Sequence, residues 1–208
     1  MSHTVGIRQA QKQKTRQALL DAALRLLEEQ SLSSLGLREV TRAVGVAPTA
    51  FYRHFRDTAD LGVALVEEAL GSLHGLIAST LADTGDSTVR IGTSVDLISD
   101  LVRTQPGHVR FIARERHGGV QPVRDAIGAQ LRRFAQEVAA AFAHEPQSAG
   151  WSEDDLLMLA SVYVDHMVMT ASVLLEAEET GPAEAERARE TARRQLRLVS
   201  LGRQHWLD

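Results

Sequence analysis

The sequence predicts an all-α protein of nine helices, in which a small N-terminal helix–turn–helix unit precedes a larger helical bundle. Apolar residues recur at three- and four-residue steps along almost the whole chain of 208 residues. No alternating strand pattern and no Asn-Gly or Asp-Gly hairpin signal is present in the sequence. Glycine, proline and short polar runs instead divide the chain into helical segments.

The first three expected helices form one unit. A helix over 11–30 presents the apolar residues Leu19, Ala22, Ala23, Leu26 and Leu27. A second helix, over 37–44, is expected to begin after Gly36 and end at Gly45, with Glu39 completing half of a capping box. Pro48 suits the first position of a third helix that carries residues 49–55. Because helices this short are unstable alone, they must pack against the first helix, as in a helix–turn–helix unit.

Six further segments follow. Longer ones are expected over 58–81, 87–103, 122–142, 152–180 and beyond Gly181-Pro182, and a short one between Pro106-Gly107 and Gly118-Gly119. A polar break is expected at 83–86, and Ser152 with the acidic residues behind it marks a strong helix start. We therefore expect two domains, residues 1–57 and residues 58–208.

Charge is divided unevenly along the chain, although the formal net charge is only −4. Residues 1–60 hold nine basic and six acidic side chains, whereas residues 61–208 hold 14 and 21. The first 16 residues contain Arg8, Lys12, Lys14 and Arg16 and no acid. A basic module on an acidic body indicates that one end meets a polyanion, although a solvated basic face is an equally simple interpretation.

Composition and motifs exclude several classes of protein. The chain has no cysteine, so disulfides and thiolate metal sites are excluded, and we expect no metal and no cofactor. Residues 1–20 show no secretory signal, and the most apolar stretch, 156–164, is far shorter than a membrane span of roughly 20 residues. No catalytic motif is present, and Asp165-His166 is better interpreted as a polar pair of the interface or pocket. We expect a cytoplasmic protein that is not an enzyme.

Residues 37–40 (Leu-Arg-Glu-Val), Gly45-Val46, residues 51–55 (Phe-Tyr-Arg-His-Phe) and Asp60-Leu61 resemble the signature of TetR-family transcriptional regulators. The resemblance covers about residues 12–62, and nine helices match the architecture of the family. One departure is Ala47-Pro48, where many members place a Ser or Thr cap. The resemblance implies a nucleoid-associated, dimeric repressor that binds double-stranded operator DNA.

Residue by residue, the resemblance assigns Tyr52 and His54 to DNA phosphates and Phe55 to the domain core. The second helix of such a unit enters the major groove, so Pro48, Thr49, Ala50 and Arg53 are the candidates for base contacts. The cations expected to neutralise phosphates are Arg8, Lys12, Lys14, Arg16 and Arg42.

The last two helices are expected to form the dimer interface. Apolar residues over 152–180 face almost every direction, so that helix should be buried on most sides. The final helix has a stripe of Ala185, Ala188, Ala192, Leu196 and Val199, which would allow close approach. Two copies of each helix would make a four-helix interface, the usual arrangement in the resembled family, and twofold symmetry would match a palindromic operator.

The bundle between the helix–turn–helix unit and the expected dimer interface has the apolar residues of a ligand pocket, although such a set of residues more often forms an ordinary hydrophobic core. The expected lining is Leu73, Ile77, Leu97, Leu101, Phe111, Phe134, Val138, Met158, Val162, His166 and Met169. Arg110, Arg114, Arg116 and His117 form a basic cluster that would suit the head of an amphiphile, and the first two are included as ligand contacts.

Residues 110–111, 114–118, 196–200 and 49–57 resemble the FabR/DesT branch of the family in particular. That resemblance implies a long-chain acyl-CoA effector and control of unsaturated fatty-acid or desaturase genes, with unsaturated chains favouring DNA binding and saturated chains opposing it. Two alternatives remain at this point. The chain could be a TetR-type repressor of a drug or another metabolite, or an acyl-CoA-handling protein without DNA binding.

Overall fold

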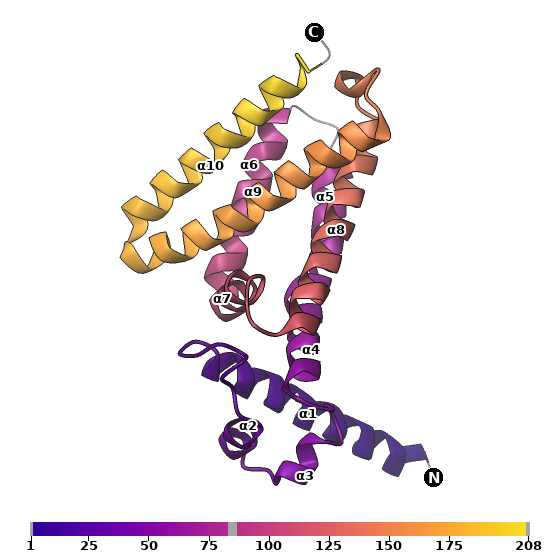
Figure 1. The fold of residues 1–208 in the computed structure, drawn as a ribbon, viewed down its shortest axis with the longest axis vertical. Coiled ribbons are helices and arrows are strands. Elements are labelled where there is room, and N and C mark those ends of the chain that lie inside the picture. Colours follow the sequence, from indigo (N-terminus) through magenta and orange to yellow (C-terminus); the bar gives the residue numbers. More distant parts are fainter. Residues whose placement is uncertain (1, 83–86, 207–208) are drawn as a thin grey trace.

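A computed structural model describes the backbone of residues 2–82 and 87–206 and the side chains of residues 9–81 and 87–206. Helices α1 (Ser2–Leu26), α2 (Leu37–Val44) and α3 (Pro48–Phe51) form a small head. The body contains α4 (Thr58–Gly71), α5 (Leu73–Ala82), α6 (Ser87–Thr104), α7 (Pro106–Glu115), α8 (Gln121–Ala143), α9 (Glu153–Thr180) and α10 (Pro182–Arg203), with a 3-10 turn η1 (Pro146–Ser148). The head lies at one end of the elongated body, and α4 runs from one to the other (Figure 1).

The all-α prediction is confirmed, with differences at several boundaries. The helix expected over 58–81 is divided at Ser72 into α4 and α5, so the described ranges contain nine helices if these two are counted together. Gly71-Ser72 is the kind of pair at which helices bend. Helix α1 begins at Ser2 rather than near residue 11 and ends at Leu26 rather than near residue 30, and α3 gives way to turns after Phe51. The break expected at 83–86 lies outside the described residues.

Local signals explain the ends of the helices. Gly36 precedes α2, and its N–H donates to Glu39 Oε2 at 3.0 Å. Gly45 ends α2 at φ 74°, a left-handed conformation that favours glycine. At the start of α9, Ser152 Oγ accepts a hydrogen bond from the N–H of Asp155 at 3.1 Å. These caps satisfy backbone groups that helix ends leave unpaired.

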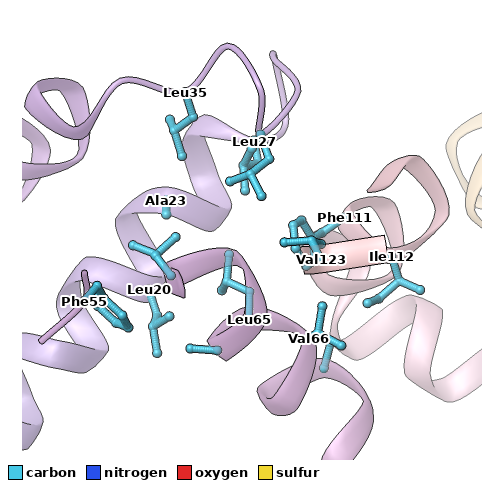
Figure 2. Close-up of a cluster of buried hydrophobic side chains, with 14 of the residues drawn as sticks. Leu20, Ala23, Leu27, Leu35, Phe55, Leu65, Val66, Phe111, Ile112 and Val123 are labelled. Carbon is cyan, nitrogen blue, oxygen red and sulfur yellow. The ribbon is translucent and has the colours of Figure 1, made fainter. Parts of the chain in front are cut away.

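Head and body share one apolar core (Figure 2). Leu20, Ala23 and Leu27 of α1 belong to the same buried cluster as Leu65 of α4 and Phe111 of α7. Gly62 makes the close approach possible, since a Cβ there would lie 2.5 Å from Leu32 Cδ2 and 2.7 Å from Val123 Cγ2. The head is therefore packed directly on α4, α7 and the start of α8.

The small-residue stripe of α10 packs inside the chain rather than outward. Ala185, Ala192 and Leu196 are fully buried, and the last two share a cluster with Ile91 and Val95 of α6. Helix α9 is buried on one face only, at positions that include Leu159, Ala160 and Leu174. The expectation that 152–180 is buried on most sides therefore does not hold within one chain.

Two segments, Thr58–Leu81 and Glu153–Thr180, are long and apolar enough to cross a bilayer on composition alone. Core helices of soluble proteins have the same composition, and the first segment is divided at Ser72. Both segments pack against α8, so their apolar character has a structural explanation within the bundle.

Candidate DNA-binding head and effector chamber

Helices α2 and α3 are joined by a tight turn that directs α3 outward. The N–H of Val46 donates to Thr41 O at 3.0 Å, and Val46 packs against the buried cluster of the head. Ala47 precedes α3 in extended conformation without a side-chain cap, and Pro48 is its first residue. This short helix is held by its buried side rather than by its cap, because Phe51 is fully buried and its ring lies 5.5 Å from that of Phe55.

The residues expected to contact DNA form the opposite, outward side of α3 and its surroundings. Pro48, Thr49 and Arg53 are exposed, Ala50 is half-buried, and the Tyr52 side chain is 63% exposed. Among the cations, Lys12, Lys14 and Arg42 are exposed, whereas the guanidinium of half-buried Arg16 lies 5.1 Å from the centre of the Phe55 ring. The side chain of Arg8 lies outside the described residues.

His54 lies beside these cations. Burial, together with the positive charges of Lys12, Arg16 and Arg53, lowers the pKa of His54 below its ordinary value. Its Nδ1 atom is buried and has no hydrogen-bond partner among the described residues. The imidazole is therefore neutral near pH 7 in the free protein, and a phosphate would favour its protonation.

The connection from α3 to α4 is fixed by an acidic pair. Asp57 Oδ1 accepts from the N–H of Asp60 at 2.8 Å, and Asp60 accepts from the N–H and the guanidinium of Arg56 at 2.9 and 3.0 Å. These hydrogen bonds lower the pKa of Asp60. The start of α4 is thereby tied to the end of the recognition segment.

The body contains an elongated, mostly apolar chamber of about 190 Å³. Its walls come from α4 to α10, and its lining includes residues of α7 and of the last turns of α10. Helix α7 lies near the head, and the end of α10 lies far from it (Figure 1). Six of the expected ligand contacts line it: Leu73, Ile77, Leu97, Leu101, Phe134 and Val138.

The other seven lie elsewhere: Arg110, Phe111, Arg114, Met158, Val162, His166 and Met169. Arg110 pairs with Glu179 at 2.5 Å, and Arg114 donates to the carbonyls of Leu27 and Gln30 at 2.8 and 2.7 Å. Phe111 is buried in the core shared with the head. Arg116, also expected in the basic cluster, pairs with Asp165 at 3.2 Å. These arginines are therefore used in contacts between helices.

Three of the seven lie on the exposed face of α9. Met158, Val162 and Met169 are 44%, 46% and 49% exposed, whereas Met167 of the same helix lines the chamber. His166 is half-buried beside the backbone of Ala192, and burial lowers its pKa. Asp165 and His166 thus have different partners, as adjacent positions on a helix require.

Several chamber residues were not expected from the sequence. Arg90, Tyr163, Ser200 and Arg203 contribute polar atoms at the end remote from the head, and His108 does so at the α7 end. Burial raises the pKa of Tyr163, against the effect of its hydrogen bond with Ser200. No local motif marks these positions, because they come from four different helices.

Residues 19–65 match the family model described as "Bacterial regulatory proteins, tetR family". The N-terminal part of the chain is therefore similar to the N-terminal domain of TetR-family regulatory proteins. TetR-family proteins are transcription factors rather than enzymes, and they bind operator DNA and small-molecule effectors. In this chain, the outward side of α3 and the apolar chamber are the two candidate sites.

Solved structures share the fold at low sequence identity. The regulatory protein TetR from Rhodobacter sphaeroides is 24% identical, with a TM-score of 0.62 over 86% of this chain and 96% of that one. FadR from Bacillus subtilis in complex with stearoyl-CoA is 14% identical, with a TM-score of 0.68 over 85% and 96%. AibR in complex with isovaleryl coenzyme A and operator DNA is 16% identical, with a TM-score of 0.65 over 86% and 95%. These similarities establish the TetR-type fold of this chain.

Proposed function

We propose that this protein is a TetR-family repressor that binds a palindromic operator as a homodimer and senses long-chain acyl-CoA. Residues 1–57 bind DNA, and residues 58–208 bind the effector and form the dimer. Unsaturated acyl chains favour operator binding and saturated chains oppose it, so that genes of unsaturated fatty-acid synthesis and desaturation are controlled. The protein acts in the cytoplasm, on the nucleoid.

The observation that carries this proposal is the elongated apolar chamber, one end of which is formed by α7. Its lining is mostly aliphatic and aromatic, which suits a hydrocarbon chain better than a compact polar metabolite. FadR and AibR, two structural neighbours, are described in complexes with coenzyme A thioesters of a long and a short acyl group.

Helix α7 connects the chamber to the head. His108, Val109, Ile112 and Ala113 line the chamber, whereas Arg114 and Glu115, at the end of the same helix, contact the segment after α1. A straight and a kinked chain would pack differently against α7 and so would favour different positions of the head. A 100-fold change in operator affinity requires a difference of about 2.7 kcal/mol between the two forms, which is within the range of allosteric couplings.

A second connection runs through His108. Its Nε2 atom lies 3.5 Å from Glu68 Oε1 of α4, and the same carboxylate oxygen accepts a hydrogen bond from Gln17 Nε2 of α1 at 3.0 Å. A displacement of His108 by the effector would therefore alter a contact of α1. A tilt of α4 and α5 would act in addition to this route, because these helices set the separation of the two DNA-binding heads in the dimer.

The homodimer is supported by apolar side chains that one chain leaves exposed. Met158, Val162, Met169 and Val173 share one face of α9 and are 44–49% exposed, and Leu198 and Leu201 of α10 are 71% and 48% exposed. Apolar patches of this kind indicate a protein interface. Two copies of α9 and α10 would cover them and align two copies of α3.

The function is tested by operator binding combined with identification of the natural effector. Purified protein should bind a fragment of the promoter beside its own gene as a dimer, with affinity that falls steeply as salt rises. Mass spectrometry of the native protein should detect bound acyl-CoA. If an aromatic drug or a polar metabolite is bound instead, the alternative of a TetR-type repressor that responds to such a compound is favoured. If the protein does not bind DNA, the remaining alternative is an acyl-CoA-handling protein.

A further inference from the structure

Apart from His108, the charged and phenolic side chains that line the chamber lie at one end of it. Among its other polar lining residues, Thr80, Ser94 and Ser172 donate their hydroxyls to carbonyls of their own helices, at 3.0, 2.8 and 3.2 Å. Arg90 of α6, Tyr163 of α9, and Ser200 and Arg203 of α10 lie together at the end remote from α7. A ligand with one polar head therefore has one chemically distinct end at which to place it.

Arg203 is the most confined of these groups. The residue is 7% exposed, its Nη1 donates to Glu145 Oε2 at 2.7 Å, and its Nη2 donates to Ser148 Oγ and to Phe142 O. Its guanidinium lies 4.5 Å from the centre of the Phe142 ring. The Nε atom is buried and makes no hydrogen bond to the described residues. A guanidinium held in place with an unused donor is suited to binding an oxygen of a ligand.

The ionised side chains around Arg203 also support a ligand oxygen at this end of the chamber. Glu145 is shared by two arginines, since its Oε1 lies 2.9 Å from Arg90 and its Oε2 lies 2.7 Å from Arg203. The side chains of all three are less than one-fifth exposed. Two guanidinium groups held at one end of the chamber favour a ligand head with acceptor oxygens.

We propose that the Arg90–Tyr163–Arg203 end of the chamber binds the oxygen atoms of an acyl head group, so that the chain extends away from it and ends against α7. This assignment rests on the proposed function, in which the effector carries an acyl chain. The head is either the thioester carbonyl of an acyl-CoA or the carboxylate of a free fatty acid, since both present acyl oxygens. Arg90 and Tyr163 are then specificity-determining residues of the effector site.

In this orientation the head group is held at one end of the chamber, so the length of the acyl chain determines how far the ligand extends along it. Arg90 and Leu101 both line it from α6 and are eleven residues apart, a rise of about 16 Å along the helix. A long chain held at Arg90 would reach Val109, Ile112 and Ala113 on α7, whereas a short one would not. The end of the chain, rather than its head, would then act on the helix that contacts the DNA-binding head.

The head-group assignment is tested by calorimetric titration with dodecanoate, dodecanoyl-CoA and dodecanol. Wild-type protein should bind dodecanoate at least about 10-fold more tightly than dodecanol. This preference should disappear in Arg90→Gln and weaken in Tyr163→Phe, which keeps the packing of the ring on Phe142. Arg193→Gln is the matched control, because Arg193 pairs with Asp96 of α6 at 2.7 Å outside the chamber, and it should retain the preference.

The titrations with dodecanoate and dodecanoyl-CoA distinguish a carboxylate head group from a thioester head group. If Arg90→Gln weakens both dodecanoate and dodecanoyl-CoA, the site takes either head. If it weakens dodecanoate alone, the effector is the free acid, and the acyl-CoA part of the proposed function is wrong while the subsite stands. Unchanged preference in both Arg90→Gln and Tyr163→Phe overturns the subsite alone. Absence of binding by every dodecyl ligand overturns the subsite and the proposed effector together.

The direction of the chain is tested at α7. Ala113→Leu should weaken palmitoyl-CoA by about 10-fold and leave decanoyl-CoA unchanged, because only the longer chain reaches this helix. Equal weakening of both chain lengths would place the head at α7 and contradict the orientation.

Discussion

Glu115 Oε1 accepts a hydrogen bond from the backbone N–H of Leu32 at 2.9 Å, across the boundary between body and head. Both groups are buried, Glu115 at 1% exposure, and the contact joins the last turn of α7 to the loop between α1 and α2. Next to it, Arg114 closes the end of α1 by donating to the carbonyls of Leu27 and Gln30. The helix that lines the chamber therefore also holds the head in position.

Removal of the Glu115 carboxylate should destabilise the protein. Glu115→Ala leaves the N–H of Leu32 buried without a partner, so we expect the free energy of unfolding to fall by about 1–3 kcal/mol in urea titrations. Glu115→Gln keeps an acceptor and should recover most of the loss. Equal destabilisation by both substitutions would show that this hydrogen bond is not the source of the effect.

His108→Leu should leave effector binding nearly unchanged but reduce the effect of the effector on operator affinity. The substitution keeps an apolar wall but removes the contact with Glu68, which connects to Gln17 of α1. We expect acyl-CoA affinity to change less than about 3-fold, while the effect of acyl-CoA on operator affinity falls about 10-fold. Gln17→Ala should reproduce the loss of coupling from outside the chamber. Full coupling in both variants would contradict the route.

Tyr52→Phe should weaken binding to every operator by about 10-fold, roughly 1.4 kcal/mol, because the phenol is expected to donate to a phosphate. The side chain is 63% exposed, so the fold should be unaffected. Fluorescence anisotropy with several operator sequences measures the effect. Unchanged affinity would exclude the phosphate contact.

Arg53→Ala should alter sequence preference rather than affinity alone. If the exposed guanidinium pairs with a guanine edge, the variant loses about 1–3 kcal/mol on the native site and discriminates less at that base pair. A set of operators with single base-pair changes reveals the position. Uniform weakening across the set would make Arg53 a backbone contact instead.

Operator affinity should rise as the pH falls from about 8 to about 6, because DNA binding protonates His54. In the free protein, burial and neighbouring cations lower the pKa of His54, and a phosphate acts in the opposite direction. The lowered pKa also means that the contribution of neutral His54 to folding stability is present above its unfolded pKa and is lost as pH falls through the folded value. His54→Gln should flatten the pH dependence of operator binding, and an unchanged slope would count against the contact.

The sequence predicted the head more accurately than the chamber, for physical reasons. Gly36, Gly45 and Pro48 act through backbone conformation at their own positions, so local patterns were sufficient. Gly71-Ser72 was an available signal for the division of the helix at 58–81. Arg110, Arg114 and Arg116 could not be placed in the same way, because their partners lie 69, 84 to 87 and 49 residues away along the chain.

The chamber illustrates the same limit. Leu73, Ile77, Leu97 and Leu101 were predicted from their apolar character, which indicates burial but not the neighbour that each side chain faces. Met158 and Met169 have the same apolar character and lie on the exposed face of α9. Arg203 was missed because a single arginine gives no sign in the sequence that Phe142, Glu145 and Ser148 surround its guanidinium.

The central claim is that the shape of an acyl chain in the chamber sets the affinity of the head for DNA. Its most direct test is the operator dissociation constant of the dimer with saturating palmitoyl-CoA, with saturating oleoyl-CoA and with coenzyme A alone. The account predicts that the two acyl forms differ by about 100-fold, with the oleoyl form binding DNA more tightly and coenzyme A having no effect. Identical dissociation constants for the two acyl forms would contradict it.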